Sequence, residues 1–374
     1  MSTRNKKKKE NRTARDRDQS QKKDQSLKKD QSLKKDRSQK KDQSQKTVGN
    51  DEPPTRNDRK KERKLIVKFI TRTLEKGPGG LRTEFATMKR FNDFSKMKAF
   101  KAAQEEGKNR YKDVGCLDNN RVKLKDPWPH EYIHANYVAT PTNPKRFICT
   151  QAPLAKTCAD FWWMCLQDRV ETIFMLCNYE EKGAKKCFEY LPSEEKPDPM
   201  VFKEKGQKVT VKFDSSSQVK FKDSQANVVK TILNIEGPAD RSLKCTHYHW
   251  IDWPDRGVPP ADAGILELLE KARVSKGPIV VHCSAGIGRT GSVVMIEYVM
   301  DQLLAGQSIE DCDKILQKIR EQRNNSVQTD HQYLFVHQVM FNYFEKKQLL
   351  DEATKAFHVE FTEKYLEMVG QKKS

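Results

Sequence analysis

Apolar and polar positions change pattern three times along the 374-residue chain. Residues 1–60 contain very few apolar side chains, and the first sustained apolar run begins at Leu65. Its helical spacing predicts a helix that ends before the breaker sequence Gly77-Pro-Gly-Gly80. A second apolar series recurs at every third position and is interpreted as another helical stretch; its members are Phe85, Met88, Phe91, Phe94, Met97 and Phe100.

Beyond residue 100, short β-like runs alternate with helical ones. Strands are predicted at 146–150, 172–177, 208–213 and 228–236, and helices at 161–167, 264–274, 292–304 and 332–344. This alternation predicts an α/β fold in which a twisted mixed β-sheet is flanked by helices. Near the C-terminus Phe357, Phe361, Tyr365 and Met368 share one helical face, which favours packing on the same domain over binding in a partner's groove.

The N-terminal segment differs in composition from the rest of the chain. It holds 21 of the 71 lysines and arginines but only 10 of the 52 aspartates and glutamates, and residues 22–45 repeat hexamers that begin Lys-Lys-Asp. We predict a disordered basic tail over 1–60 because so few apolar groups could be buried. A solvated spacer is the first interpretation; weak contact with nucleic acid or an anionic membrane, or nuclear import through Lys6–Lys9, stays open.

Several classes of protein are disfavoured by the sequence. No stretch of 18 apolar residues predicts a transmembrane segment, and the lysine-rich start is unlike a secretory signal. Nine cysteines are scattered without a Cys-x-x-Cys pair, which indicates free thiols in a reducing compartment and neither a disulfide framework nor a zinc module. We therefore expect a cytoplasmic location, with the nucleus as an additional one, and the sequence does not indicate an oligomeric state.

The strongest chemical signal is the stretch Gly277-Pro-Ile-Val-Val-His-Cys-Ser-Ala-Gly-Ile-Gly-Arg-Thr-Gly291. Ile279–Val281 predicts a short buried strand, a loop with two glycines follows, and an apolar helix comes next. Backbone N–H groups of such a loop and the N-terminus of the helix converge on one point, where they bind an anion. Gly286 and Gly288 relieve the clashes that inward-pointing amides would otherwise cause.

Cys283 opens this loop and Arg289 closes it. The amides and the helix dipole would lower the pKa of the thiol, and the planar guanidinium can bind two phosphate oxygens. A thiolate that faces a tetrahedral oxyanion is a nucleophile suited to attack phosphorus. A buried core cysteine with an unrelated arginine is the competing interpretation. It is disfavoured because only one of the nine cysteines has an arginine six positions later, and it lies in this strand–loop–helix context.

Residues 281–291 resemble the active-site loop of classical, tyrosine-specific protein phosphatases, most closely the nematode group. The similarity covers most of residues 65–345 and implies a catalytic domain over 61–348, between the tail of 1–60 and a helical extension over 349–374. It also implies a cysteinyl-phosphate intermediate without metal or cofactor. The loop residues that would bind or support the phosphate and thiolate are His282, Ser284, Ala285, Gly286, Ile287, Gly288 and Thr290.

Two further motifs imply proton and water chemistry by this resemblance. Trp253-Pro-Asp255 is similar to the family's mobile acid loop, in which Asp255 would protonate the leaving phenolate and later act as a base. Gln328 and Gln332 lie in a segment similar to the family's glutamine loop. Gln328 would orient the attacking water, and Gln332 would assist. Taken alone, Asp255 would be interpreted as an ordinary turn aspartate beside proline. Two surface glutamines that open a helix are the competing, less favoured interpretation of Gln328 and Gln332.

Substrate recognition is implied by Lys108-Asn-Arg-Tyr111-Lys-Asp113. Tyr111 would stack on a phosphotyrosine ring in a deep slot and Asp113 would hold the substrate backbone, so phosphotyrosine proteins are the expected partners. Glu181 would brace Arg289, and Lys186 would reach toward the acid loop. The basic side chains of Arg110, Lys112 and Lys186 would favour acidic phosphopeptides.

Four positions depart from the family's pattern. Arg256 follows the acid-loop aspartate, and Asn325 stands near the pocket mouth where glycine is common. His134 and Leu191 replace the usual asparagine and tryptophan of two framework motifs, whereas Trp162 and Trp163 are expected in the core. These departures keep a second hypothesis open, in which the protein is a catalytically weak or inactive scaffold that binds phosphotyrosine.

Overall fold

The computed structural model describes residues 56–371, so the hexamer repeats lie outside the described residues. The first element is the long helix α2, Arg56–Thr87, which is broken at Gly77. Gly77 has φ 62° and ψ 173°, a backbone conformation that glycine adopts without strain, and Pro78 cannot continue the preceding hydrogen-bond ladder. The break that the sequence predicted at Gly77 is therefore present.

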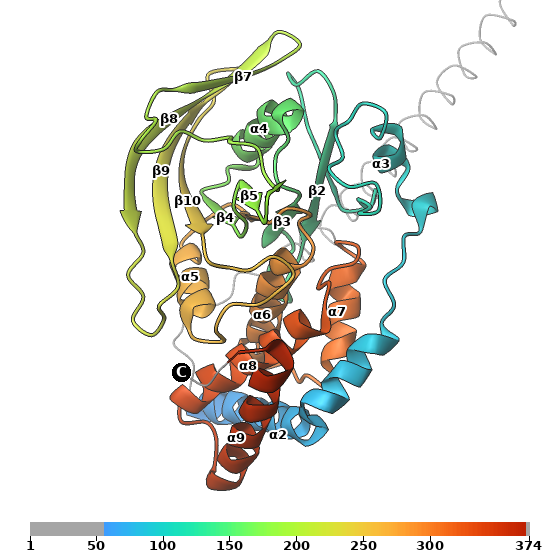
Figure 1. Cartoon of the computed structure of the whole chain (residues 1–374), viewed down its shortest axis with the longest axis vertical. Coiled ribbons are helices and arrows are strands. Elements are labelled where there is room, and N and C mark those ends of the chain that lie inside the picture. The colour runs from blue at the N-terminus through green and yellow to red at the C-terminus, as the bar shows by residue number, and fades with distance from the viewer. Residues whose placement is uncertain (1–55, 372–374) are drawn as a thin grey trace, which may run out of the picture. The chain divides into compact units, whose positions relative to one another are not determined.

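A nine-stranded mixed sheet forms the centre of the domain (Figure 1). From one edge to the other, its order is β1-β2-β3-β11-β4-β10-β9-β8-β7. The strands are β1 Arg121–Lys123, β2 Tyr132–Val138, β3 Phe147–Thr150, β4 Thr172–Met175, β7 Met200–Glu204, β8 Gln207–Gln218, β9 Val228–Glu236, β10 Ser242–Trp250 and β11 Ile279–His282. The pairs β3–β11, β11–β4 and β4–β10 are parallel, and the outer pairs are antiparallel. A separate hairpin joins β5 Glu180–Glu181 to β6 Ala184–Lys185.

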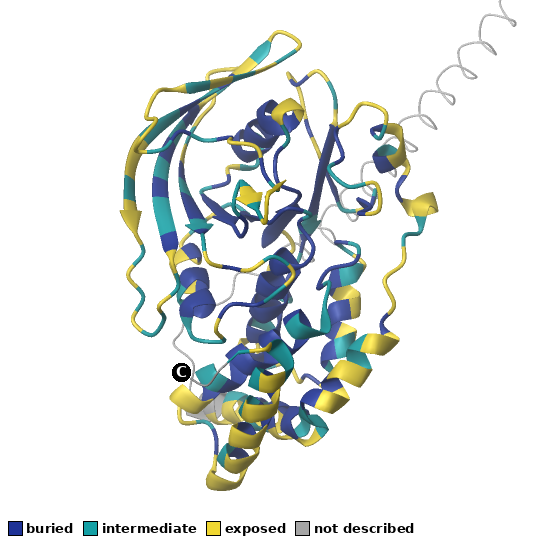
Figure 2. Ribbon diagram, in the orientation of Figure 1, coloured by how far each residue is buried: buried dark blue, intermediate teal, exposed yellow. Residues whose placement is uncertain are grey.

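Helices cover both sides of the sheet. Helix α4, Cys158–Asp168, lies within the curve of β7–β10 (Figure 1), and Trp162 and Trp163 on it are fully buried. The other helices are α3 Lys98–Ala102, α5 Gly264–Ala272, α6 Arg289–Leu304, α7 Cys312–Arg320, α8 Asp330–Lys346 and α9 Glu352–Val369. Helix α6 is buried almost along its whole length (Figure 2), because β11, α7 and α8 pack around it.

The mixed α/β fold predicted from the alternation is confirmed. The strand predicted at 228–236 coincides with β9, and the helices predicted at 264–274 and 332–344 correspond to α5 and α8. The strand predicted at 208–213 is longer, because β8 reaches Gln218. Helix α6 begins at Arg289, three residues before the predicted start, because Thr290, Gly291 and Ser292 have low helix propensity and conceal its first turn.

The second helical stretch predicted across residues 85–100 is wrong. After Thr87 the chain is irregular, with only a short 3₁₀ turn at Phe94–Lys96 and α3 beyond it. A spacing of three residues advances the side chain by about 300° on a helix, so the apolar stripe rotates by about 60° at each step and holds no constant face. Accordingly, Phe91 is 73% exposed.

Helix α9 packs against α2 and α8 of the same body. Phe361 and Tyr365 are buried in the main core, whereas Phe357 is 54% exposed, so three of the four residues in the expected stripe face inward at least in part. Across residues 56–371, no helix combines the length and apolar character needed to cross a bilayer.

Candidate active site

The loop Cys283–Gly288 connects the central strand β11 to helix α6. Strand β11 lies between β3 and β4, and all three run parallel, so the loop leaves the sheet at its carboxyl edge. Ligands of open α/β sheets bind at this edge, where helix N-termini also gather. The sequence-predicted arrangement of strand, glycine-containing loop and helix is therefore present.

The carbonyl groups of this loop point away from its centre. Each accepts a hydrogen bond from the surrounding framework: Ser284 O from Ala152 N, Ala285 O and Gly286 O from the Arg323 guanidinium, Ile287 O from Val327 N, and Gly288 O from Ser292 N. Because peptide N–H and C=O groups point in opposite directions, this outward set leaves the loop amides available to a ligand. One of them, Gly286 N–H, already donates to Cys283 Sγ at 3.2 Å.

Gly286 is required by the close approach of the loop to β3. Its φ is +70°, and a Cβ at this position would lie 1.9 Å from the Thr150 carbonyl oxygen. Gly288 has a different constraint, since its Cβ would lie 2.5 Å from Gln328 Oε1. Both glycines therefore allow the loop to sit close to neighbouring elements, a reason that differs from the relief of clashes around inward-pointing amides that the sequence suggested.

Cys283 is buried, and burial by itself raises the pKa of a thiol. The Arg289 guanidinium, Thr290 and the Gly286 N–H outweigh this effect and lower the pKa of Cys283. The buried Thr290 hydroxyl has no other hydrogen-bond partner among the described residues, so it is available to the sulfur. The opposite holds for Cys149, Cys158 and Cys245, whose pKa values burial raises above 9. None of the nine cysteines forms a disulfide.

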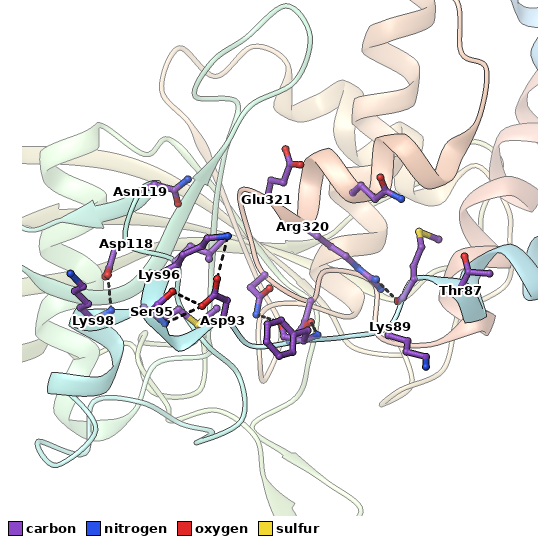
Figure 3. A pocket seen from close by; sticks show the side chains of 17 residues that line it. Thr87, Lys89, Asp93, Ser95, Lys96, Lys98, Asp118, Asn119, Arg320 and Glu321 are labelled. Carbon is purple, nitrogen blue, oxygen red and sulfur yellow. Dashed lines mark hydrogen bonds and ion pairs between the residues drawn. The ribbon is translucent and has the colours of Figure 1, made fainter.

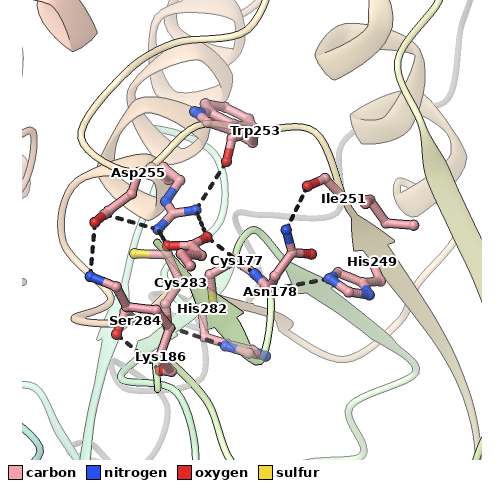
Figure 4. Close-up of polar contacts among 12 residues, drawn as sticks. Cys177, Asn178, Lys186, His249, Ile251, Trp253, Asp255, His282, Cys283 and Ser284 are labelled. Carbon is pink, nitrogen blue, oxygen red and sulfur yellow. Dashed lines mark hydrogen bonds and ion pairs between the residues drawn. The ribbon is translucent and has the colours of Figure 1, made fainter. Parts of the chain in front are cut away.

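Arg289 is held by a two-pronged ion pair with Glu181. Nη1 donates to Oε1 at 2.6 Å and Nη2 to Oε2 at 2.8 Å, and both side chains are more than 90% buried. Nη1 also donates to the Trp253 carbonyl at 3.1 Å, and Nη2 to Asp255 Oδ1 at 3.2 Å (Figure 4). The guanidinium is thereby fixed in one plane, with its charge offered to the loop.

Asp255 lies over the same loop, between two cations. Its Oδ2 pairs with Lys186 Nζ at 2.8 Å while its Oδ1 faces Arg289 (Figure 4). Burial alone would raise the pKa of this carboxyl, but Lys186, Arg289 and Arg256 more than offset it and lower the pKa of Asp255. An acidic role therefore requires that a ligand change this environment. A bound dianion would compete for Arg289 and repel the carboxylate, and both effects raise its pKa.

A cavity of about 140 Å³ collects the predicted catalytic and recognition residues. It is lined by Tyr111, Asp113, Val114, Lys186, Asp255, Arg256, Cys283, Ser284, Ala285, Arg289, Gln328 and Gln332. The Tyr111 hydroxyl lies 2.8 Å from Ser284 Oγ, which itself donates to the Lys186 carbonyl at 2.9 Å. Tyr111 thus stands as a wall tied to the floor of the cavity.

The glutamine segment approaches the loop from α8. Gln332 Oε1 accepts from Gln328 N at 2.8 Å, so one glutamine positions the backbone of the other. The preceding residue, Val327, has φ +59°, which is unusual for a β-branched residue, and its N–H donates to Ile287 O at 2.9 Å. This strained residue anchors the segment to the Cys283–Gly288 loop.

His282 supports the loop from below as a neutral imidazole. Burial lowers its pKa to about 3. Its Nδ1 lies 3.3 Å from the Cys283 carbonyl, which only accepts, so Nδ1 carries the proton and Nε2 accepts from the Tyr190 hydroxyl at 2.7 Å. Tyr190 Oη in turn lies 2.7 Å from His247 Nε2. A buried chain therefore runs from the Cys283 carbonyl to β10.

One residue of this neighbourhood, Arg323, escaped the sequence analysis, and the contacts of His134 were not foreseen. Arg323 is completely buried, and it donates to the carbonyls of Ala285 and Gly286 and lies 3.2 Å from His134 Nδ1. His134 Nε2 lies 2.8 Å from the Val114 carbonyl, so this departure from the family pattern links the catalytic loop to the Tyr111 loop. Arg323 occurs in a charged stretch of sequence typical of a surface, and only the three-dimensional contacts identify it.

Two of the noted basic residues have other partners. The Arg110 guanidinium donates to the carbonyls of Ala152 and Pro153 and does not line the cavity. The Lys186 ammonium is engaged by Asp255. Lys112 alone is exposed and without such a contact in the structure described for residues 56–371, so the expected steering of acidic peptides by three cations is reduced.

Asn325, expected near the pocket mouth, does not line the cavity that contains Cys283. It has φ +59°, accepts from Phe91 N at 3.1 Å and donates to Asn92 Oδ1 at 3.0 Å. It lines instead a larger hollow of about 1330 Å³, which lies between residues 87–98 and the end of α7 (Figure 3). This hollow contains neither Cys283 nor Arg289, and its lining mixes basic and acidic side chains. The smaller cavity is therefore the one that brings Cys283, Arg289 and Asp255 together.

Among residues 60–371, one cluster of three carboxylates is compact enough to hold a cation. Glu84, Asp311 and Asp313 offer oxygens within 4.8 Å of one another. Lys76 Nζ already bonds to Asp311 at 2.9 Å and to Glu84, so an ammonium group of the chain itself is paired with two of the three carboxylates. None of the three residues lines the cavity that contains Cys283.

The Arg289–Glu181 pair leads to a first prediction. We expect Glu181→Gln to lower kcat/KM roughly 10- to 100-fold, because a neutral amide cannot hold both guanidinium nitrogens and small misplacements at a reacting centre cost about this much. Steady-state kinetics on a phosphotyrosine peptide measures it. Glu180→Gln, at the exposed neighbouring position, is the matched control. Equal rates for both variants would contradict a bracing role.

Comparison with known proteins gives a consistent result. Residues 105–342, more than half of the chain, match the family model described as protein-tyrosine phosphatase. The human tyrosine-protein phosphatase non-receptor type 12 is 35% identical over 257 residues, which are 66% of this chain and 31% of that protein. The human tyrosine-protein phosphatase non-receptor type 9 is 30% identical over 302 residues, 75% of this chain and 49% of that protein.

Two further matches cover a similar share of this chain. The human receptor-type tyrosine-protein phosphatase zeta is 37% identical over 248 residues, which are 62% of this chain but 10% of that protein. A solved structure, titled as the structural basis of the PTPN18 fingerprint on distinct HER2 tyrosine phosphorylation sites, aligns with a TM-score of 0.60 at 26% identity. It covers 75% of this chain and 99% of the solved one. The chain thus spans less than half the length of these curated relatives.

Proposed function

The chain belongs to the protein-tyrosine phosphatase family, and from this membership we propose that it hydrolyses phosphotyrosine in proteins through a cysteinyl-phosphate intermediate. One observation carries the proposal furthest. A thiol with a lowered pKa lies in a loop whose carbonyls all point outward, and Arg289 and Asp255 line the same small cavity. This arrangement favours attack by sulfur on a bound phosphate.

The proposed first step transfers the phosphoryl group to Cys283. The thiolate attacks phosphorus while the bond from phosphorus to the phenolic oxygen breaks, and protonated Asp255 gives its proton to the departing oxygen. The loop amides and Arg289 stabilise the charge on the three other oxygens. Thr290 donates to the sulfur. In the second step, water positioned by Gln328 and Gln332 attacks phosphorus, Asp255 takes its proton, and the phosphorus–sulfur bond breaks to release inorganic phosphate.

The proposed substrate class depends on the Tyr111 wall. Tyr111 is tied to Ser284, and a phenyl ring is long enough to pass along it and bring its phosphate to the loop. A phosphoserine side chain is shorter, so its phosphate would be held away from Cys283. Asp113 lines the mouth of the cavity and is placed to accept hydrogen bonds from the backbone amides of a bound peptide.

Initial rates on paired peptides test this proposal. We expect the full chain to dephosphorylate a phosphotyrosine peptide and a small aryl phosphate in EDTA with fresh reductant. The matched phosphoserine peptide should react at least about 100-fold more slowly, the scale of loss that a misplaced reacting group produces. Similar rates on both peptides, or rates abolished by EDTA, would overturn it. Folded protein that binds phosphotyrosine peptide without turnover would instead establish the scaffold hypothesis.

The cellular compartment is part of the proposal. All nine cysteines are unpaired, and a nucleophilic thiol needs reducing conditions, so we propose the cytoplasm, with the nucleus as a further location. The role of residues 1–60 in localisation stays a prediction, since residues 1–55 lie outside the described residues.

A further inference from the structure

Arg256 follows Asp255 in the chain and lines the same cavity. Consecutive residues of a strand point to opposite sides, but residues 254–257 form a turn, in which Gly257 N–H donates to the Pro254 carbonyl at 3.2 Å. Both side chains can therefore face the cavity. Asp255 is partly buried, whereas Arg256 is exposed, so Arg256 belongs to the mouth of the cavity.

The backbone of Arg256 has a conformation that is unusual for arginine. Its φ is +59°, in the left-handed region that glycine or asparagine usually occupies in a turn. A larger residue adopts this conformation at a cost in free energy, and costs of this kind are concentrated at functional sites. The conformation therefore favours a functional role for the Arg256 side chain.

Arg256 is also the one cation of the cavity lining that has no carboxylate partner among the described residues. The other two are paired, because Lys186 Nζ lies 2.8 Å from Asp255 Oδ2 and Arg289 is held by Glu181. The Arg256 guanidinium makes no hydrogen bond or ion pair within the described part of the chain. Its charge still acts in the cavity, since it contributes to the lowered pKa of Asp255. This guanidinium is therefore available to a ligand.

The position at the mouth decides which part of a substrate Arg256 can meet. In the proposed complex the phosphate lies on the Cys283–Gly288 loop and the phenyl ring lies beside Tyr111, so the peptide backbone is held outside the cavity. The residues next to the phosphotyrosine are then the ones that can reach an exposed guanidinium. A planar guanidinium binds both oxygens of a carboxylate side by side, which makes aspartate and glutamate its best partners.

From these observations we propose that Arg256 is a specificity-determining residue, which binds the carboxylate of an aspartate or glutamate next to the phosphotyrosine of the substrate. The inference rests on the proposed phosphatase function and names the peptides that it prefers. Two neighbouring residues of one turn then have separate roles: Asp255 transfers the proton, and Arg256 selects the peptide.

Rates on three matched phosphotyrosine peptides test this role. The peptides are identical except that the residues on both sides of the phosphotyrosine are glutamate, glutamine or lysine. For the full chain we expect kcat/KM to be about 2- to 5-fold higher for the glutamate peptide than for the glutamine peptide, and lowest for the lysine peptide. High salt should reduce this preference. Arg256→Gln should make the glutamate and glutamine peptides equal, and Arg256→Glu should favour the lysine peptide.

The comparison between peptides separates this contact from other effects of the arginine charge. Loss of Arg256 also changes the pKa of Asp255, but that change alters the rates on all three peptides alike and cancels in their ratio. Lys271→Gln removes an exposed positive charge on α5 outside the cavity and should keep the preference. A preference that survives Arg256→Gln, or that Lys271→Gln also removes, would contradict the proposal.

Inorganic phosphate has no neighbouring residue, so its inhibition constant should stay within about twofold in Arg256→Gln, the effect of one distant exposed charge. An equal loss of affinity for inorganic phosphate and for all three peptides would show that Arg256 binds the phosphate itself, and would overturn its role in selection.

Direct binding distinguishes failure of this proposal from failure of the proposed function. Cys283→Ser should bind the three peptides in the same order of affinity, and adding Arg256→Gln should remove the difference between the glutamate and glutamine peptides. If no peptide is turned over but this order of binding holds, the phosphatase function fails and the role of Arg256 stands. Turnover of all three peptides with equal kcat/KM would leave the function standing and overturn the role of Arg256.

Discussion

Cys283→Ser is expected to reduce turnover of a phosphotyrosine peptide by roughly 10⁵-fold or more, the scale seen when a nucleophile is removed from an enzyme. Serine keeps the size and the loop contacts but replaces a thiol of lowered pKa by a hydroxyl that stays protonated at every practical pH. Arg289 and the outward-turned carbonyls are unchanged, so the phosphate-binding geometry persists. Peptide affinity should therefore stay measurable.

The measurement pairs steady-state kinetics with direct binding of the same peptide. Cys312→Ala is the control, because Cys312 is a buried cysteine on α7 whose pKa burial raises and which does not line the cavity. It should retain turnover, provided that thermal unfolding shows both variants to be folded. Turnover within about tenfold of the unmodified protein in Cys283→Ser would remove the cysteinyl-phosphate step from the mechanism.

The contiguous part of this site could be predicted from the sequence by physical reasoning. Cys283, Gly286 and Arg289 lie within seven residues, and strand, loop and helix follow one another without interruption. Local chain geometry then fixes which groups converge, so an anion site follows from a few residues. The lowered pKa of Cys283 follows from the same local amides and the same arginine.

Contacts between distant segments could not be derived in this way. Glu181 lies 108 positions from Arg289, and nothing in the hairpin around it distinguishes this carboxylate from its neighbour Glu180. Asp255, Gln328 and Tyr111 were likewise expected from family resemblance and not from their own spacing. The fold brings them to one cavity at one edge of the sheet. Strands β10 and β11 both end at this edge, and the segments that follow them begin there.

Buried polar residues were hardest to recognise. Within residues 56–371 Arg323 has no carboxylate partner, and its guanidinium donates instead to two carbonyls, to Asn136 and to His134. A single sequence shows a charged residue, and its average behaviour is exposure. The buried Nδ1 of His247, which has no hydrogen-bond partner among the described residues, is equally invisible, because this depends on contacts in the folded chain. Both are identified only from the hydrogen bonds in the three-dimensional structure.

Asp255→Asn is expected to lower kcat on a phosphotyrosine peptide by about 10²- to 10⁴-fold, the usual contribution of a general acid. The loss should depend on the leaving group. A nitrophenolate leaves readily without a proton, so p-nitrophenyl phosphate should lose much less than phenyl phosphate. Asp252→Asn is the matched control, since Asp252 is exposed on the same segment and its carboxylate accepts only from Asn227 N in the described structure.

The dependence of kcat and kcat/KM on pH tests the same role of Asp255. Catalysis needs Cys283 deprotonated and Asp255 protonated, so the rate rises with pH as the thiol ionises and falls as the carboxyl loses its proton. Lys186, Arg289 and Arg256 outweigh burial and lower the pKa of Asp255 in the free protein, which places the fall of kcat/KM on the acid side. A bound phosphate dianion repels the carboxylate and raises its pKa, so the fall of kcat should occur at higher pH than that of kcat/KM.

In Asp255→Asn the fall of the rate with rising pH should disappear from both profiles, whereas the rise that reports thiol ionisation should remain. Replacing Lys186 separates the two contributions further. Lys186→Met removes the strongest partner that lowers the pKa of Asp255, so the fall of kcat/KM should move toward higher pH. If the rate of Asp255→Asn still fell with rising pH, another group would have to supply the proton. The ion pair of Asp255 with Lys186 would then serve only to hold the loop over the cavity.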